Sequence, residues 1–253
     1  MDPLQFLVLA VLGVVGGMLA GAAGVGGGIV FVPTLVYVAG WDIKEAVAAS
    51  LVIIIFSSIA GTIRNQRGED PVDWRTTAIL SSTVAPATLI GVYVASVSPE
   101  TVVQVVFAII LLALAYPTAH DRPDVDPNAK KLPIPLVLLA GIFIGALSGL
   151  VGVGGGVVMV PLMMLGMGLK TKRAVSTSLA VIMFAGIVGS IGYIATGFSD
   201  LLSLPPLILG SMVGAWLGVR LRERLPEKAV RRGFAGFMVI VAFRILVDAA
   251  SIL

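Results

Sequence analysis

The chain of 253 residues contains no cysteine and one histidine, and only 12% of its residues are charged. Without cysteine it can form no disulfide, no thiolate metal site and no cysteine nucleophile. The histidine, His120, lies in a segment rich in proline and aspartate, where we expect it to be solvated. The acidic residues lie in expected loops or near the ends of apolar segments, so no buried carboxylate relay for protons is evident. These absences argue against a catalytic site, a metal site and a bound cofactor.

Hydrophobic residues make up 58% of the chain. Its charged fraction, 12%, is about half of the roughly 25% that is typical of a soluble domain. Two of the apolar runs, 28–40 and 156–168, are too short to cross a hydrocarbon core of about 30 Å. We expect helical segments at 4–23, 28–40, 45–63, 76–97, 100–116, 133–151, 156–168, 174–197, 203–219 and 233–252. The sequence therefore predicts an all-α polytopic membrane protein. Its first residues lack the positive region of a cleaved signal peptide.

One stretch of the chain occurs twice. Residues 17–36 read GMLAGAAGVGGGIVFVPTLV and residues 145–164 read GALSGLVGVGGGVVMVPLMM, with 11 of 20 positions identical at an offset of 128. The register continues, because KEAVAASL from Lys44 aligns with KRAVSTSL from Lys172. A duplicated, glycine-broken apolar segment is the best sequence pointer to the binding site of a secondary transporter.

Most basic residues fall into four clusters. The positive-inside rule predicts that all four clusters lie in the cytoplasm. This placement explains the net charge of +3 better than nucleic-acid binding does. The clusters are Arg64, Arg67 and Arg75; Arg122, Lys130 and Lys131; Lys170, Lys172 and Arg173; and Arg220, Arg222, Arg224, Lys228, Arg231 and Arg232. The basic loop after the third segment of the first copy, 64–75, has a bare counterpart, 197–202, in the second copy, and the next loops reverse this pattern. The two copies therefore have opposite orientations, which requires an odd number of passes in each.

Counting each glycine-broken region as a helical hairpin gives five passes per copy and a 5+5 inverted-topology repeat. Repeat one is 1–116 with hairpin 4–40, the cytoplasmic linker is 117–132, and repeat two is 133–253 with hairpin 133–168. Both termini are then extracytoplasmic. A count of eight spans, with an unbroken first helix in each half, would make the halves parallel and leave the charge reversal unexplained.

The glycine motif of each copy is a candidate anion site. Glycine accepts φ > 0 and lets a ligand approach the backbone N–H groups. Each short helix that follows carries an early proline, Pro33 or Pro161, and directs free N–H groups and a positive dipole end toward the turn. The expected substrate-lining glycines are Gly24, Gly26, Gly27, Gly28, Gly152, Gly154, Gly155 and Gly156. The alternative is a purely structural turn.

Glycines spaced by four before each motif predict close helix packing rather than a site. These are Gly13, Gly17 and Gly21 in one copy and Gly141, Gly145 and Gly149 in the other.

Hydroxyl groups after each hairpin can donate to an oxyanion or bond to a carbonyl of their own helix. Ser50, Thr177 and Ser178 are the stronger candidates for substrate binding, and Ser57, Ser58 and Ser176 are weaker ones. Ala49 stands opposite Thr177, so the half-sites are chemically unequal.

Two cations, Lys44 and Arg244, lie outside the four basic clusters. Lys44 and Lys172 are expected at helix entrances on opposite membrane faces, where they either snorkel or attract anions. Arg244 and Asp248 are spaced to pair on one helix face near the outer interface.

The paired Gly-x-Gly-Gly-Gly motifs with the following Val-Pro, and then Ala-Val-x-x-Ser, resemble the TauE/SafE family of sulfite exporters and toluene-sulfonate permeases. The motif carries over to Gly24, Gly26, Gly27, Gly28 and Pro33, and to Gly152, Gly154, Gly155, Gly156 and Pro161. The resemblance implies transport of sulfite, sulfonates, sulfoacetate or related anions in a bacterial-type inner membrane.

We therefore expect a secondary carrier of small anions that works by alternating access, with Na⁺ or H⁺ as a possible coupling ion, lipids around it and no nucleic-acid partner. An anion channel, or a carrier of other small organic anions, is the alternative. A non-transporting scaffold or membrane enzyme fits less well.

Overall fold

A computed structural model describes residues 3–119, 131–198, 200–201, 203–221 and 227–252. The expectations for the first two residues, for His120, and for the basic residues Arg122, Lys130, Arg222 and Arg224 lie outside the described residues.

The all-α class is confirmed: the described residues form helices joined by short turns and contain no strand. The helices are α1 (Pro3–Ala23), α2 (Gly28–Tyr37), α3 (Ile43–Gln66), α4 (Trp74–Val97), α5 (Glu100–Ala119), α6 (Ile134–Val151), α7 (Gly156–Pro161), which the π-helix η1 (Leu162–Gly166) continues, α8 (Thr171–Ala195), α9 (Pro205–Leu221) and α10 (Glu227–Ile252). The helix break between α1 and α2, and that between α6 and α7, fall at the glycine motifs as predicted.

Six of the described helices, α1, α3, α4, α5, α6 and α8, are long and apolar enough to cross a membrane. Their side chains are apolar nearly all round, and their backbone groups bond within each helix, which is what a hydrocarbon surrounding demands. The chain is therefore a multi-pass membrane protein. The shorter apolar helices include α2, α9 and the α7–η1 segment.

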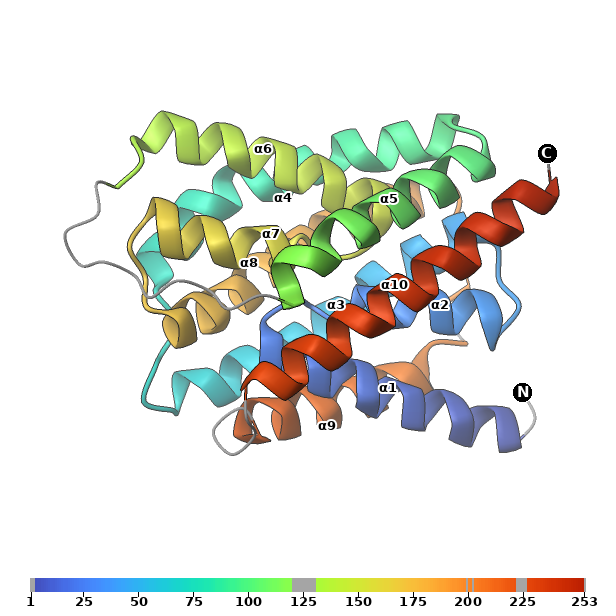
Figure 1. Ribbon diagram of the computed structural model, residues 1–253, viewed down its shortest axis with the longest axis horizontal. Coiled ribbons are helices and arrows are strands. Elements are labelled where there is room, and N and C mark those ends of the chain that lie inside the picture. The colour runs from blue at the N-terminus through green and yellow to red at the C-terminus, as the bar shows by residue number, and fades with distance from the viewer. Residues whose placement is uncertain (1–2, 120–130, 199, 202, 222–226, 253) are drawn as a thin grey trace.

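The helices pack in pairs that join the two halves of the sequence. α1 lies along α9 at one edge and α6 lies along α4 at the other, while α3 and α8 pair between these edges (Figure 1). α5 and α10 contact each other in front of this group, and α1 begins at the same end of the molecule where α10 ends (Figure 1). The central pair α3–α8 is the scaffold that carries both glycine turns.

The spaced glycines pack the helices at both edges, as predicted. A Cβ atom on Gly17 would meet the Ser211 carbonyl of α9, and one on Gly145 would meet the Val84 carbonyl of α4. Only glycine allows these backbones to approach so closely.

The predicted pair on α10 is also confirmed. Arg244 Nε lies 3.4 Å from Asp248 Oδ2, one turn along the helix. The Arg244 guanidinium also lies over the Tyr37 ring, 5.6 Å from its centroid. Arg244 thus links α10 to the end of α2.

Candidate transport site

Each glycine motif forms a tight turn between two helices. Gly24, Gly26 and Gly27 have φ of 71°, 81° and 83°, and Gly152, Gly154 and Gly155 have φ of 68°, 79° and 72°. These left-handed values are unfavourable for residues with a Cβ. The same three positions of each motif therefore require glycine for the backbone alone, whatever the turn binds.

The two turns are held by serines from the opposite repeat. Ser50 Oγ on α3 lies 2.8 Å from the Gly152 carbonyl oxygen, and Ser178 Oγ on α8 lies 2.7 Å from the Gly24 carbonyl oxygen. Each hydroxyl also lies within hydrogen-bond distance of a carbonyl in its own helix, Val47 or Val175. The sequence predicted these serines at the site but not their acceptors, because an offset between repeats does not reveal which half contacts which.

The turns also pack directly against each other. A Cβ on Gly28 would meet the Gly152 carbonyl and, at 2.7 Å, the Val153 Cα. One on Gly156 would meet the Gly24 carbonyl and, at 2.8 Å, the Val25 Cα. The fourth glycine of each motif is thus required by contact with the opposite turn.

Two isoleucines complete the centre and were missed by the sequence reasoning. Ile54 on α3 and Ile182 on α8 are fully buried and stand at equivalent positions of the two repeats. Ile182 Cγ2 lies 3.0 Å from a Cβ built on Gly26 and 2.8 Å from one built on Gly154, and Ile54 contacts both positions from the other side. In this conformation the isoleucines fill the space beside the turns. Their matching positions in the aligned repeats were the available signal.

Each turn presents the start of a short helix to this centre. Gly27 and Gly155 are the N-caps of α2 and α7, and neither start carries a side-chain cap. The first N–H groups of a helix have no partner within it, so these tips can donate to an anion without a fixed cation.

Pro33 and Pro161 are each the sixth residue of their helix, later than the first turn where proline is best tolerated. After Pro161 the backbone widens into the π-helix Leu162–Gly166. A proline lacks the N–H that would bond to the preceding turn, which explains the locally altered hydrogen bonding.

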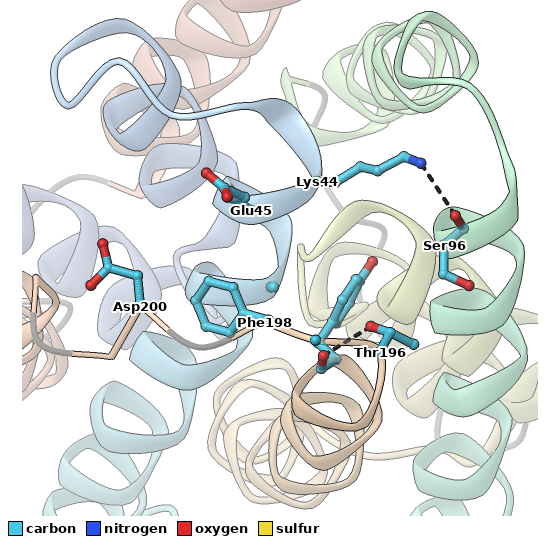
Figure 2. A pocket seen from close by; sticks show the side chains of 9 residues that line it. Lys44, Glu45, Ser96, Thr196, Phe198 and Asp200 are labelled. Atoms are coloured by element: carbon cyan, nitrogen blue, oxygen red, sulfur yellow. Dashed lines mark hydrogen bonds between the residues drawn. The ribbon is translucent and has the colours of Figure 1, made fainter.

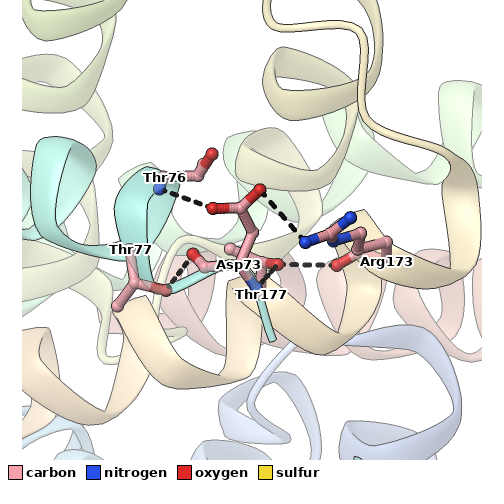
Figure 3. Close-up of polar contacts among 5 residues, drawn as sticks. All are labelled: Asp73, Thr76, Thr77, Arg173 and Thr177. Atoms are coloured by element: carbon pink, nitrogen blue, oxygen red, sulfur yellow. Dashed lines mark hydrogen bonds and ion pairs between the residues drawn. The ribbon is translucent and has the colours of Figure 1, made fainter. Parts of the chain in front are cut away.

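Thr177 lies away from the turns, near the beginning of α8. Its Oγ1 accepts a hydrogen bond from the Asp73 N–H at 3.0 Å and lies 2.7 Å from the Arg173 carbonyl oxygen (Figure 3). Asp73 in turn caps α4 and forms an ion pair with Arg173, Oδ2 to Nη2 at 3.5 Å. The structure therefore places Thr177 in the contact between α8 and the α3–α4 loop.

The weaker hydroxyl candidates divide. Ser176 bonds to the Lys172 carbonyl in its own helix, the structural alternative stated above. Ser57 Oγ lies 3.4 Å from the Gly26 carbonyl, so it does reach a turn. Ser58 is buried next to it, and its Oγ has no hydrogen-bond partner among the described residues.

A cavity of about 290 Å³ opens at the start of α3 (Figure 2). Its lining residues are Lys44, Glu45, Ala48, Ser96, Tyr193, Thr196, Gly197, Phe198 and Asp200. Lys44 turns aside to donate to the Ser96 carbonyl at 3.3 Å. The Tyr193 hydroxyl donates to the Gly149 carbonyl at 2.9 Å, close to the turn at Gly152. The cavity thus extends from the molecular surface toward the second glycine turn.

Among the described residues no three His, Cys, Asp or Glu side chains gather as metal ligands. The polar chemistry at the centre consists of backbone N–H groups, carbonyls and hydroxyls. Such a set suits a small anion or a weakly held monovalent cation.

Comparison with known proteins gives a family match over nearly the whole chain. The family model described as Sulfite exporter TauE/SafE matches residues 9–245. The chain is 27% identical over 252 residues to the probable membrane transporter protein YunE of Bacillus subtilis (strain 168), covering 90% of this chain and 92% of that protein.

It is 29% identical over 259 residues to a probable membrane transporter protein of Haemophilus influenzae, covering 94% and 97%. It is also 27% identical over 155 residues to Sulfite exporter TauE/SafE family protein 5 of Arabidopsis thaliana, covering 52% and 34%. No solved structure matches the chain significantly.

Proposed function

We propose that this chain, which belongs to the TauE/SafE family of membrane transporters, is a secondary carrier of small sulfur-containing anions that works by alternating access. Sulfite, sulfonates and sulfoacetate are the proposed substrates. The single observation that carries the proposal is the meeting of two uncapped helix starts at the centre of the membrane protein, each held by a serine of the other repeat.

The helix packing supports a 5+5 inverted repeat. α1 packs on α9, while α6, the counterpart of α1, packs on α4, the counterpart of α9. Likewise α3 packs on α9 as α8 packs on α4. A two-fold axis between the halves requires this exchange of partners, and opposite orientations of the halves explain the reversal of the basic loops. In the proposed topology both termini are extracytoplasmic and the membrane is a bacterial-type plasma membrane.

The anion class follows from the chemistry of the turns. Helix starts and hydroxyls donate hydrogen bonds, which suits the oxygens of a sulfite or sulfonate. Gly24, Gly26, Gly27, Gly28 and their counterparts would contact the substrate once Ile54 and Ile182 move apart. Na⁺ or H⁺ is the proposed coupling ion.

The test is counterflow in proteoliposomes preloaded with unlabelled sulfite or a sulfonate. Saturable uptake of the labelled anion supports a carrier, and large currents without saturation or counterflow favour an anion channel. Gly27→Val and Gly155→Val should abolish flux, because each position has φ > 0 and a Cβ would meet the Phe31 ring or the Ile144 side chain.

Two outcomes would overturn the assignment. The substrate class fails if a panel of sulfur oxyanions neither binds nor moves while a sugar or cation binds saturably. Full flux in both glycine variants would mean that transport needs neither glycine. Gly40→Val is the matched control, since Gly40 has φ of 74° but open space around its Cβ position.

A further inference from the structure

The described residues line two cavities, or mouths, at equivalent positions of the repeats, and one of these mouths is open while the other is nearly closed. The open cavity of about 290 Å³ lies at the start of α3, and a cavity of about 20 Å³ lies at its end. The two are lined by residues that the repeat places at equivalent positions: Lys44 and Lys172, Tyr193 and Asn65, Thr196 and Gly68. The length of α3 separates the mouths by roughly 30 Å. One mouth is therefore the closed counterpart of the other.

Behind the closed mouth lies a buried polar stripe. Ser58 and Thr62 are one turn apart on α3, between Ser57, which reaches the Gly26 turn, and Asn65, which lines the closed mouth. Both hydroxyls are more than nine-tenths buried, and neither has a hydrogen-bond partner within the described chain. A buried hydroxyl without a partner costs free energy, so these hydroxyls remain available to donate to a ligand. Ser190 on α8 is the counterpart of Thr62, and its buried hydroxyl likewise has no hydrogen-bond partner among the described residues.

The closed mouth is held by a pair of opposite charges. Asp73 Oδ2 lies 3.5 Å from Arg173 Nη2, and Thr177 accepts a hydrogen bond from the Asp73 backbone (Figure 3). This contact ties the loop before α4 to the start of α8, next to Lys172 in the wall of the closed cavity.

The open mouth carries two like charges at the same places. Glu45 stands at the position of the first repeat that is equivalent to Arg173 in the second. Asp200 lies one position before the strict counterpart of Asp73, and each of these two aspartates accepts a hydrogen bond from the backbone N–H three residues on, that of Ser203 or Thr76. Both carboxylates line the open cavity, and Lys44 points away from them toward Ser96 (Figure 2). Like charges oppose closure of this mouth, whereas the opposite charges of Asp73 and Arg173 favour closure of the other.

We infer that the closed mouth conceals the second half of the anion path, lined by Ser58 and Thr62, and that Asp73 and Arg173 form its gate. The like-charged Glu45 and Asp200 keep the opposite mouth open. This inference rests on the proposed carrier function. The hydroxyls of Ser58 and Thr62 would donate to the oxyanion when the gate opens.

Single cysteines test the gate without any substrate, because the natural chain has none. Ser96→Cys reports on the open mouth, because Ser96 is partly exposed in the wall of the open cavity, and Thr62→Cys reports on the concealed path, because Thr62 is buried. In membrane vesicles of both orientations, a membrane-impermeant maleimide should label Ser96→Cys at least tenfold faster than Thr62→Cys. Adding Asp73→Asn, which keeps the helix cap but removes the charge, should raise labelling of Thr62→Cys several-fold and lower that of Ser96→Cys.

Two further variants sharpen the result. Glu45→Arg supplies a partner for Asp200 and should lower labelling of Ser96→Cys, while Arg173→Lys keeps the charge and should leave both rates near those of the parent. Glu100→Gln removes an acidic charge that lines neither cavity and is the control.

The gate is refuted if labelling of Thr62→Cys is unchanged in Asp73→Asn, or if Glu100→Gln changes the two rates as much as Asp73→Asn does. Altered labelling without sulfite flux would support the gate and reject the substrate. Flux with unaltered labelling would support the carrier and reject the gate.

Discussion

Replacing Ser50 or Ser178 with alanine should destabilise the protein by removing the bonds between its two halves. Each hydroxyl reaches a carbonyl of the opposite turn at 2.8 or 2.7 Å, and each is fully buried. Side-chain hydrogen bonds between membrane helices contribute about 0.6 kcal/mol on average and about 1.7 kcal/mol at most. Because the glycine carbonyl is left without its donor, we expect about 1 kcal/mol for each variant, toward the upper part of that range.

A loss of this size lowers the melting temperature of a chain this long by about 2–4 °C, which thermal unfolding in detergent can resolve. Ser82→Ala is the matched control, since Ser82 bonds only within its own helix, to the Ile79 carbonyl at 2.7 Å, and is exposed. The double variant Ser50→Ala with Ser178→Ala should lose less than the sum of the singles, because both bonds join the same two turns. If Ser50→Ala and Ser82→Ala melt alike, the cross-repeat bonds do not hold the turns together.

Three further outcomes follow from single positions. Gly26→Ala should reduce flux and thermal stability more than Gly40→Ala. Both glycines have φ > 0, but only a Cβ on Gly26 would meet a neighbour, Ile182 at 3.0 Å. Equal losses of the two variants in thermal melting and counterflow would contradict this reasoning. Ile54→Ala should destabilise by about 2–5 kcal/mol as a buried cavity forms beside the turns, measured by the same melting assay. Arg244→Gln should cost under about 1 kcal/mol and leave flux within twofold, because its pair is partly exposed; loss of transport would give that arginine a functional role.

Local features of the fold could be predicted from the sequence because they depend on neighbouring residues. The apolar runs, the helix breaks at Gly24–Gly27 and Gly152–Gly155, and the packing role of Gly17 and Gly145 all follow from spacing and backbone preference. Pairing across the repeats could not be predicted in the same way. The compositions of α1 and of its counterpart α6 are too similar to show which of the two packs on α9. The choice depends on how closely the helix surfaces fit together.

In the candidate site, too, local features could be predicted from the sequence, whereas tertiary contacts could not. The turn geometry follows from glycine itself, and Ser50 and Ser178 were identified by their identical positions in the repeats. Thr177 is predicted with them as a hydroxyl that follows the hairpin, yet adjacent helical residues point about 100° apart, and its hydroxyl accepts a hydrogen bond from the Asp73 N–H. The packing of Ile54 against both turns depends on tertiary structure, so the apolar character of this residue alone could not reveal its place at the site.

In the proposed carrier, the differences between the two halves determine which state is favoured. Two identical inverted repeats would give the states open to either side equal free energy, so any bias must come from positions where the copies differ. The side chains of Arg173 and Asp73 are 48% and 25% exposed, so their pair contributes about 0.2–1 kcal/mol. The bond from the Asp73 N–H to Thr177, which Ala49 cannot form in the other copy, adds about 0.5–1.5 kcal/mol.

A total of about 1–2 kcal/mol favours one state by a factor of about 5–30. That bias sets a resting state, yet it is small enough for the differential binding of one small anion to reverse. A fully buried ion pair would cost several kcal/mol to break and would hold the carrier in a single state. We therefore expect Glu45→Arg, which gives the open mouth at the start of α3 an attractive pair of its own, to slow turnover by stabilising closure at both mouths. Unchanged turnover in counterflow would show that opening of the mouths does not limit the cycle.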